Sequence, residues 1–246
     1  MTTSHPPRVR TVPVAGATVS LRESGDPAGP AAVLLHGGTS SAATWDRLAT
    51  ALTAAGHHVI AADLRGHGGS SRTRDYPLHG YSDDIHGLMD ALAIGSAALV
   101  GHSLGGYAAS VLAALEPERV SRLVLEEPGM PARDAESSHG LSGPRFLVAA
   151  LAGLAGRRGY DRRAVTSAVR QLRRPDPGWW DRLPLITAPT LLISGGPASH
   201  IPSRQLAEAA GSIPCSRIVT IAAGHRVHSR RPEQFLAAVM PFLAAG

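Results

Sequence analysis

The chain has 246 residues, of which 43% are hydrophobic, a composition that suits one α/β domain with a large core and excludes a disordered chain. Its formal net charge is +5, and all 24 basic residues are arginines, whose high pKa lifts the sequence pI to about 10.3. No apolar run could span a bilayer, residues 1–10 lack the apolar segment of a secretory signal, and the single cysteine excludes an intrachain disulfide. We therefore expect a cytoplasmic protein without membrane association.

The first half of the chain alternates apolar strands with amphipathic helices. Two strands, at residues 9–14 and 18–23, are expected to form a hairpin. Short apolar strands of the kind buried in parallel sheets are then predicted at 31–35, 58–62, 97–100 and 123–125. The helices predicted between them cover 45–55, 82–92 and 107–115. Strands that alternate with helices predict a mostly parallel sheet with helices on both faces.

The pattern changes at residue 129 and resumes near residue 190. The intervening segment is rich in Arg, Gly and Pro, with helices predicted at 147–154 and 162–172. We interpret 129–189 as a short, mainly helical lid over one end of the sheet, and 1–128 with 190–246 as the core. The remaining core elements are predicted at 190–193, 203–210, 217–221 and 232–244.

Arginines gather within residues 157–174. A nucleic-acid surface would combine such a cluster with aromatic side chains that stack on bases, but only Tyr160 lies among the arginines and no nucleic-acid motif is present. A solvated helix face explains the cluster better. We expect a small-molecule substrate and no nucleic-acid partner.

A G-x-S-x-G motif centred on Ser103 lies between a predicted strand and a predicted helix. That context is typical of a nucleophile elbow, in which Gly101 and Gly105 permit a sharp turn and the serine oxygen is lifted clear of the sheet. The N–H of Leu104 opens the helix and is free to face a developing oxyanion. The alternative is a tight turn that holds an ordinary serine.

A serine hydroxyl is a poor nucleophile at neutral pH and needs a general base. His225 follows the last strand and precedes the last helix, so it lies at the same carboxyl edge of the sheet as Ser103. His228 is the competitor, one helical turn further on, and a structural loop histidine is the alternative role for His225. We favour His225 as the base.

The oxyanion needs a second backbone donor, and the segment after strand 31–35 is placed to supply it. The N–H of Gly38 is the candidate, paired with that of Leu104, because glycine permits a close approach of backbone to substrate. His36 is expected to support this loop rather than to take part in the chemistry.

Over essentially its whole length the chain resembles the α/β-hydrolase fold superfamily, with serine before histidine in chain order. The motifs that carry the resemblance are HGG at 36–38, DLRGHGGS at 63–70, GHSLGG at 101–106 and GH at 224–225. The resemblance implies a serine hydrolase without a metal ion and without an organic cofactor.

The chain departs from the family at the acid of the triad. In the family the acid commonly follows the strand equivalent to 190–193, but here Ala198 occupies that position. Some members, including certain dehalogenases, carry the acid after the strand that follows the elbow helix, where this chain has Glu126 and Glu127. Because side chains alternate along a strand, only one of them should face His225. We favour Glu127; a solvated strand end is the alternative, and Asp63 is the next candidate.

Substrate contacts are expected mostly from the lid. Phe146, Trp179 and Trp180 could line an apolar pocket, although each could instead pack the lid onto the core. His200 lies beside the lost acid position and could line the pocket or orient His225.

These features predict an esterase-, lactonase- or thioesterase-like serine hydrolase that cleaves a small to medium apolar substrate through an acyl-Ser103 intermediate. The altered acid loop motivates one alternative, a non-hydrolytic lyase or cyclase that acts on a biosynthetic intermediate. A catalytically silent ligand-binding protein is the other, and the intact Ser103, His225 and Gly38 argue against it. The serine also argues against an epoxide hydrolase or dehalogenase, because those members use aspartate at the elbow.

Overall fold

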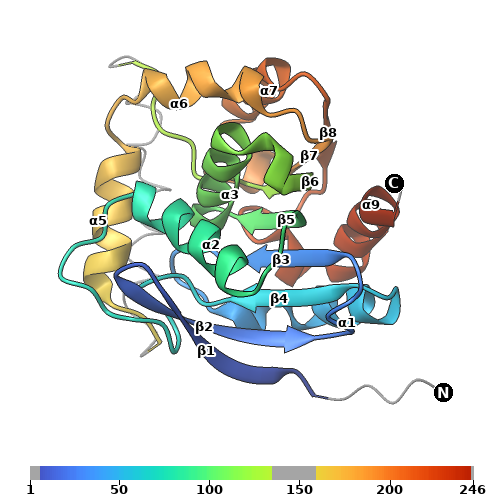
Figure 1. Ribbon diagram of the computed structural model, residues 1–246. Coiled ribbons are helices and arrows are strands. Elements are labelled where there is room, and N and C mark those ends of the chain that lie inside the picture. The colour runs from blue at the N-terminus through green and yellow to red at the C-terminus, as the bar shows by residue number, and fades with distance from the viewer. Residues whose placement is uncertain (1–5, 135–158, 245–246) are drawn as a thin grey trace.

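The computed structural model describes residues 6–134 and 159–244, which form an eight-stranded sheet in the order β1-β2-β4-β3-β5-β6-β7-β8 (Figure 1). The β1–β2 and β2–β4 pairs are antiparallel, and the remaining pairs are parallel. The predicted mostly parallel sheet is confirmed. Its strands are β1 (Arg8–Val14), β2 (Ala17–Ser24), β3 (Ala31–Leu35), β4 (His58–Ala62), β5 (Ala97–His102), β6 (Val120–Glu126), β7 (Thr190–Ser194) and β8 (Ser216–Thr220).

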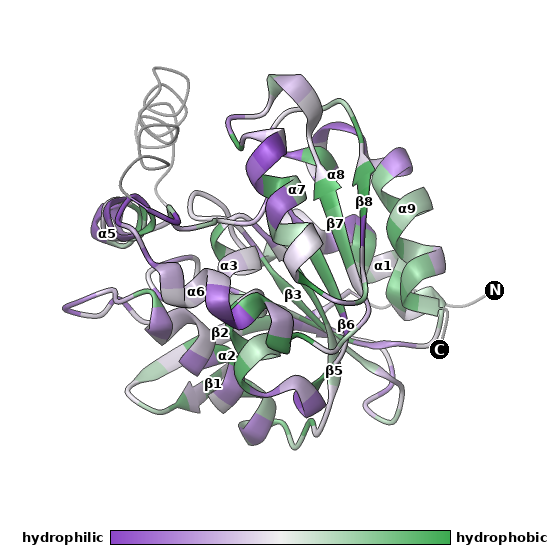
Figure 2. Ribbon diagram, turned by 90° about the horizontal axis from the view of Figure 1, so that it is seen from above, coloured by the Kyte–Doolittle hydropathy of each residue, from purple (hydrophilic) through white to green (hydrophobic). Residues whose placement is uncertain are grey.

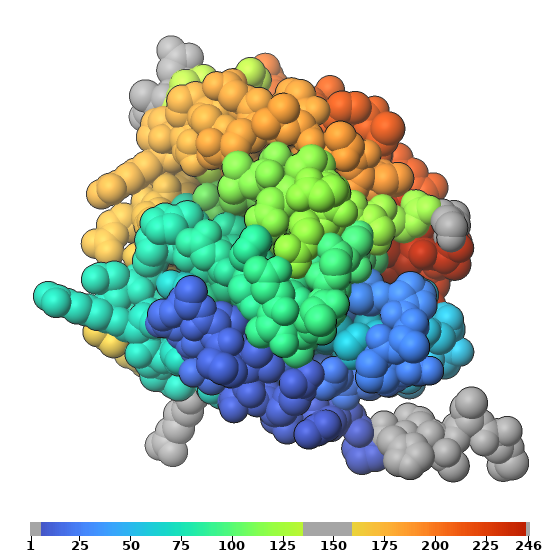
Figure 3. All heavy atoms as spheres, viewed as in Figure 1, coloured from blue at the N-terminus to red at the C-terminus, as the bar shows by residue number. Residues whose placement is uncertain are grey.

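Helices cover both faces of the sheet, as predicted (Figures 1 and 2). One face, called here the α3 face, carries α2 (His79–Ala91), α3 (Leu104–Leu115) and α7 (Ser203–Ser212). The opposite face, called the α9 face, carries α1 (Asp46–Ala54) and α9 (Pro232–Ala244). In Figure 3, α2 and α3 lie between the blue β1–β2 hairpin and the orange segment that follows residue 159.

The central strands are buried on both sides. Every residue of β4, β5 and β7 is buried, which explains their continuous apolar character and the green strands of Figure 2. Apolar side chains from the two faces of these strands enter two separate cores, one on the α3 face and one on the α9 face. Burial on both faces holds the carboxyl ends of β3, β5, β6 and β7 together at one edge, where the predicted site lies.

The predicted lid is described only in part. Its second helix is confirmed as α5 (Arg162–Leu172), capped by Asp161, whose carboxylate accepts the backbone N–H of Arg163. The predicted helix 147–154 and Phe146 lie outside the described residues. In α5, Ala164, Val165 and Ala168 are buried while arginines are exposed, in agreement with a solvated basic face.

Two short helices, α6 (Pro177–Arg182) and α8 (Val227–Arg230), were not predicted, because helices of six and four residues are too short to show a helical period. In the described part of the chain, no helix is both long and apolar enough to cross a membrane.

Candidate active site

Ser103 occupies a strained turn between β5 and α3. Its φ of 51° and ψ of −114° fall where residues with a Cβ are rare. The flanking glycines are required by close packing: a Cβ at Gly101 would lie 2.5 Å from the carbonyl oxygen of Gly105, and one at Gly105 would lie 2.3 Å from that of Leu35. The sharp turn expected of a nucleophile elbow is therefore present, and Ser103 is half-buried at the edge of a pocket.

The two proposed oxyanion donors lie beside Ser103 in that pocket. Leu104 is the first residue of α3, so its N–H is one of those that a helix leaves without an intrahelical partner. Gly38 lines the same pocket, and its carbonyl oxygen accepts a hydrogen bond of 2.8 Å from His67 Nε2. The crowded glycine of this loop is Gly37, where a Cβ would lie 2.6 Å from His102 Nδ1. The loop is thus held from two sides.

His36 supports the loop in a single protonation state. Its Nδ1–H donates to the carbonyl of Gly37 at 2.8 Å, and its Nε2 accepts the backbone N–H of Leu64 at 3.0 Å. Complete burial is the main cause that lowers the pKa of His36 to about 3, assisted by the nearby His67. The ring is therefore neutral in the folded protein, as the acceptor role of Nε2 requires.

The buried neutral His36 makes folding stability sensitive to acid. Its pKa is lower in the folded than in the unfolded chain, so its contribution is present above pH 6.5 and is lost as the pH falls toward 3. We expect the unfolding free energy to fall by about 2 kcal/mol more for the wild type than for His36→Gln between pH 6 and 4.5. Glutamine retains an acceptor near Nε2 but does not titrate. Urea unfolding at both pH values measures the difference, and parallel pH dependences would contradict the assignment.

Glu127 and His225 lie together on the proposed catalytic side. His225 Nδ1 is 3.3 Å from Glu127 Oε2, a distance at which its N–H donates to the carboxylate. Glu127 follows β6 with a φ of 47°, which turns it out of the strand alternation. Burial is the main cause that raises the pKa of Glu127, and two hydrogen-bond donors partly offset this rise.

Those two donors come from the loop in which Ala198 replaces the usual acid. The N–H of Gly195 donates to Glu127 Oε1 at 2.6 Å, and the hydroxyl of Ser199 donates to Oε2. The loop in which the family resemblance places the acid therefore supplies donors to Glu127 instead. Hydrogen bonds to the carboxylate favour its charged form, which a partner of His225 needs.

Glu126 points to the opposite side. Its Oε1 accepts the N–H of His228 at 3.0 Å, and its Oε2 accepts His228 Nδ1–H at 2.6 Å. Glu126 and Glu127 are both fully buried, so the alternative of a solvated strand end is wrong. Asp63 binds the backbone N–H groups of Ala42 and Gly69, a structural role away from His225.

The proposed base, His225, is held in its neutral form. Burial is the main cause that lowers its pKa well below 6.5, and His200 and Arg226 lower it further. The ring of His200 lies against that of His225 with the centroids 4.0 Å apart. Among the hydrogen bonds of the described residues, none joins His225 to Ser103; such catalytic contacts commonly tighten only when substrate binds.

The pocket at Ser103 has a cavity volume of about 80 Å³. Its residues come from the elbow, the Gly38 loop, the segment after β6, α5 with the residue that follows it, and the Ser199 loop. They are Gly38, Ser103, Leu104, Gly129, Met130, Val165, Ala168, Val169, Leu172, Arg173, His200 and Ile201. The α5 wall was missed in the sequence, although its four apolar members have the i, i+3, i+4, i+7 spacing of one helix face.

Of the predicted substrate contacts, His200 lines this pocket, whereas Trp179 and Trp180 do not. Both tryptophans are buried in the core of the α3 face, so their assignment as pocket residues is corrected. Trp179 Nε1–H donates to Ser110 Oγ at 3.1 Å and Trp180 Nε1–H to the carbonyl of Pro131 at 3.0 Å. Their large apolar area is used to pack α6 onto α3.

Comparison with known proteins identifies the family to which this fold belongs. A family model described as alpha/beta hydrolase fold matches residues 30–157. The sn-1-specific diacylglycerol lipase ABHD11 of Mus musculus is 30% identical over 264 aligned residues, with coverage of 89% of this chain and 83% of the mouse protein. The 2-(acetamidomethylene)succinate hydrolase of Mesorhizobium japonicum is 30% identical, with coverage of 96% and 95%. The solved structure of E-2-(acetamidomethylene)succinate hydrolase has a TM-score of 0.81 and 28% identity, with coverage of 97% of this chain and 100% of that chain.

Proposed function

The chain belongs to the α/β-hydrolase fold family, and on that premise we propose that it hydrolyses small, apolar esters, thioesters or lactones through an acyl-Ser103 intermediate. One observation carries the proposal: Ser103 sits on a strained elbow at the edge of an apolar pocket, on the same sheet edge as the pair formed by half-buried His225 and buried Glu127. Strain of this kind is retained where it serves a function.

In the proposed mechanism, Ser103 Oγ attacks the substrate carbonyl carbon while its proton passes to His225 Nε2. The N–H groups of Gly38 and Leu104 stabilise the negative charge that develops on the carbonyl oxygen. His225 then protonates the leaving group, which departs as alcohol or thiol. His225 then deprotonates a water molecule that attacks the acyl carbon, and it returns this proton to Ser103 Oγ as the ester bond to the enzyme breaks and the acid is released. Glu127 holds the Nδ1–H tautomer of His225 and stabilises the imidazolium.

The substrate class follows from the pocket. Its α5 wall and the side chains of Met130 and Ile201 offer apolar contacts, and its small volume favours a short acyl group. The mouse relative is named as a lipase that acts on diacylglycerol, an ester, which supports ester chemistry for this chain.

A fluorophosphonate tests the proposal, because it reacts with serine only when the hydroxyl is activated. We expect the wild-type protein to be labelled at one serine, which peptide mass spectrometry identifies as Ser103, and to hydrolyse p-nitrophenyl acetate and butyrate faster than longer esters. Ser103→Ala should not be labelled. Folded wild-type protein without label would contradict the proposal.

Product analysis in ¹⁸O-water separates hydrolysis from the lyase or cyclase alternative. Hydrolysis places solvent oxygen in the acid product. A product formed without solvent oxygen would favour the non-hydrolytic reaction.

A further inference from the structure

His102 and Glu126 occupy equivalent places on neighbouring strands, each directly before a residue of the proposed triad. They are register partners in the β5–β6 ladder, so their side chains share a face of the sheet. Val100 and Val124, two residues earlier on each strand, belong to the core of the α9 face. The side chains of His102 and Glu126 therefore enter the α9 face, whereas Ser103 and Glu127 serve the catalytic edge.

His102 holds the backbone of the proposed base. Its Nε2–H donates to the carbonyl oxygen of His225 at 2.7 Å, which leaves a lone pair on Nδ1. That Nδ1 is buried and has no hydrogen-bond partner within the described part of the chain. The ring also packs against Gly37 of the oxyanion loop. His102 thus contacts both the loop that carries the base and the loop that carries an oxyanion donor.

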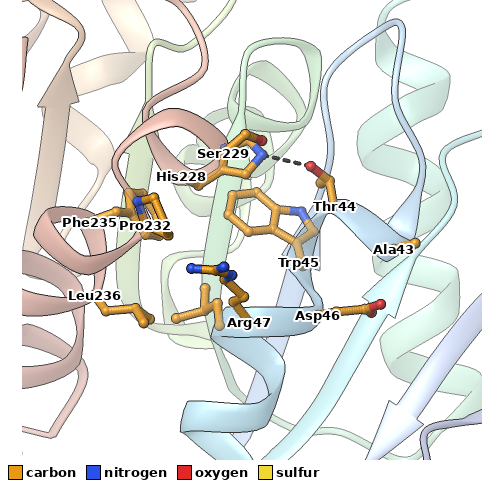
Figure 4. A pocket seen from close by; sticks show the side chains of 11 residues that line it. Ala43, Thr44, Trp45, Asp46, Arg47, His228, Ser229, Pro232, Phe235 and Leu236 are labelled. Carbon is orange, nitrogen blue, oxygen red and sulfur yellow. Dashed lines mark hydrogen bonds between the residues drawn. The ribbon is translucent and has the colours of Figure 1, made fainter. Parts of the chain in front are cut away.

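Glu126 holds the chain three residues after His225, in the first turn of α8. Its carboxylate binds both the backbone N–H and the Nδ1–H of His228, and it is completely buried. His228 Nε2 in turn accepts the hydroxyl of Thr44 at 2.8 Å, and its ring lies against Trp45, with centroids 4.4 Å apart (Figure 4). The hydrogen bonds from Glu126 through His228 to Thr44 connect the segment that carries His225 to the segment that precedes α1.

We propose that His102 and Glu126 are positioning residues, which clamp the 225–228 segment at two points, one before α8 and one within it, and so fix His225 against Glu127 and Ser103. The inference rests on the proposed function, because it assigns these residues an effect on the rate through His225. Two clamps are needed because His225 lies outside regular structure, between β8 and α8. A catalytic group that moves by 1 Å can lose about 100-fold in rate.

The matched variants His102→Gln and His102→Asn test the first clamp. The amide nitrogen of glutamine reaches the position of Nε2 and can donate to the His225 carbonyl, whereas that of asparagine stops near Nδ1. We expect His102→Asn to lower kcat for p-nitrophenyl butyrate by about 10- to 100-fold with KM changed less than about twofold, and His102→Gln to recover most of that loss. Thermal unfolding monitored by circular dichroism controls for folding.

A double-mutant cycle separates action through His225 from a general structural defect. In a His225→Ala background, His102→Asn should cause no further loss, because the group that it positions is already absent. An equal loss in both backgrounds, or an unchanged kcat in His102→Asn, would overturn the inference.

Crystal structures of the two variants give a readout that does not depend on activity. We expect the 3.3 Å contact between His225 Nδ1 and Glu127 Oε2 to be kept in His102→Gln and broken in His102→Asn. An unmoved His225 in His102→Asn would overturn the clamp. If Ser103→Ala and His225→Ala retained the wild-type rate, the proposed function would fail instead, and these structures would still decide whether His102 positions the loop.

Discussion

Ser103→Ala is expected to lower kcat for ester hydrolysis by about 10⁵- to 10⁶-fold. Alanine removes the hydroxyl that is proposed to form the acyl intermediate and leaves the proposed oxyanion donors and the pocket in place. This fold-change corresponds to a loss of about 7–8 kcal/mol of transition-state stabilisation. The remaining rate reflects substrate binding and the proposed oxyanion donors. Stopped-flow and steady-state assays with p-nitrophenyl butyrate measure the change.

Ser121→Ala is the matched control for this substitution. Ser121 is exposed near the amino end of β6, at the opposite edge of the sheet from Ser103. Its replacement should leave kcat within about twofold, as expected for a surface change away from any special feature. A Ser103→Ala protein that kept a tenth or more of the wild-type kcat would rule out covalent catalysis at this serine.

Glu127→Gln is expected to lower kcat by about 10³- to 10⁴-fold. The glutamine amide cannot stabilise the imidazolium, and when its NH₂ faces His225 Nδ1 it favours the wrong tautomer. The contact that is lost is the 3.3 Å approach to His225, while Gly195 N–H can still donate to the amide oxygen. Fold should therefore persist while the rate falls, and kcat with thermal unfolding checks both.

Glu126→Gln supplies the comparison, because it makes the same chemical change one residue earlier. Glu126 contacts His228 rather than His225, so its replacement should cost at least tenfold less in kcat than Glu127→Gln. Equal losses for the two glutamines, or a greater loss for Glu126→Gln, would contradict the assignment of Glu127 as the acid.

Much of the fold follows from local patterns along the chain. Apolar runs of five or six residues, separated by amphipathic helices, predict a parallel sheet because only strands covered on both faces are apolar throughout. The elbow was also predictable from a local pattern, because its glycines lie between a strand and a helix. The structure shows why they are needed: a Cβ at Gly101 would lie 2.5 Å from the carbonyl oxygen of Gly105. The short helices α6 and α8 could not be predicted, because they have too few residues to show a helical period.

The pocket is less predictable, because the same apolar residue serves a core or a cavity. Trp179 and Trp180 resembled pocket residues in the sequence but are buried against Ser110 and Pro131. The wall of α5 carried the spacing of an amphipathic helix, but nothing in that spacing says whether its apolar face meets another helix or a substrate.

By itself the sequence determined the parallel architecture and the elbow that carries Ser103, and it favoured a pair of adjacent glutamates as candidates for the acid. These are local properties, because hydrophobic period, glycine at crowded turns and strand alternation all act within a few residues. Only the tertiary structure decided that Glu127 meets His225 while Glu126 meets His228. That choice depends on the turn at Glu127 and on its contacts with the Ser199 loop and with His225. The residues that make these contacts are about 70 to 100 residues away in the chain. Contacts at such separations arise from packing, and no local pattern encodes them.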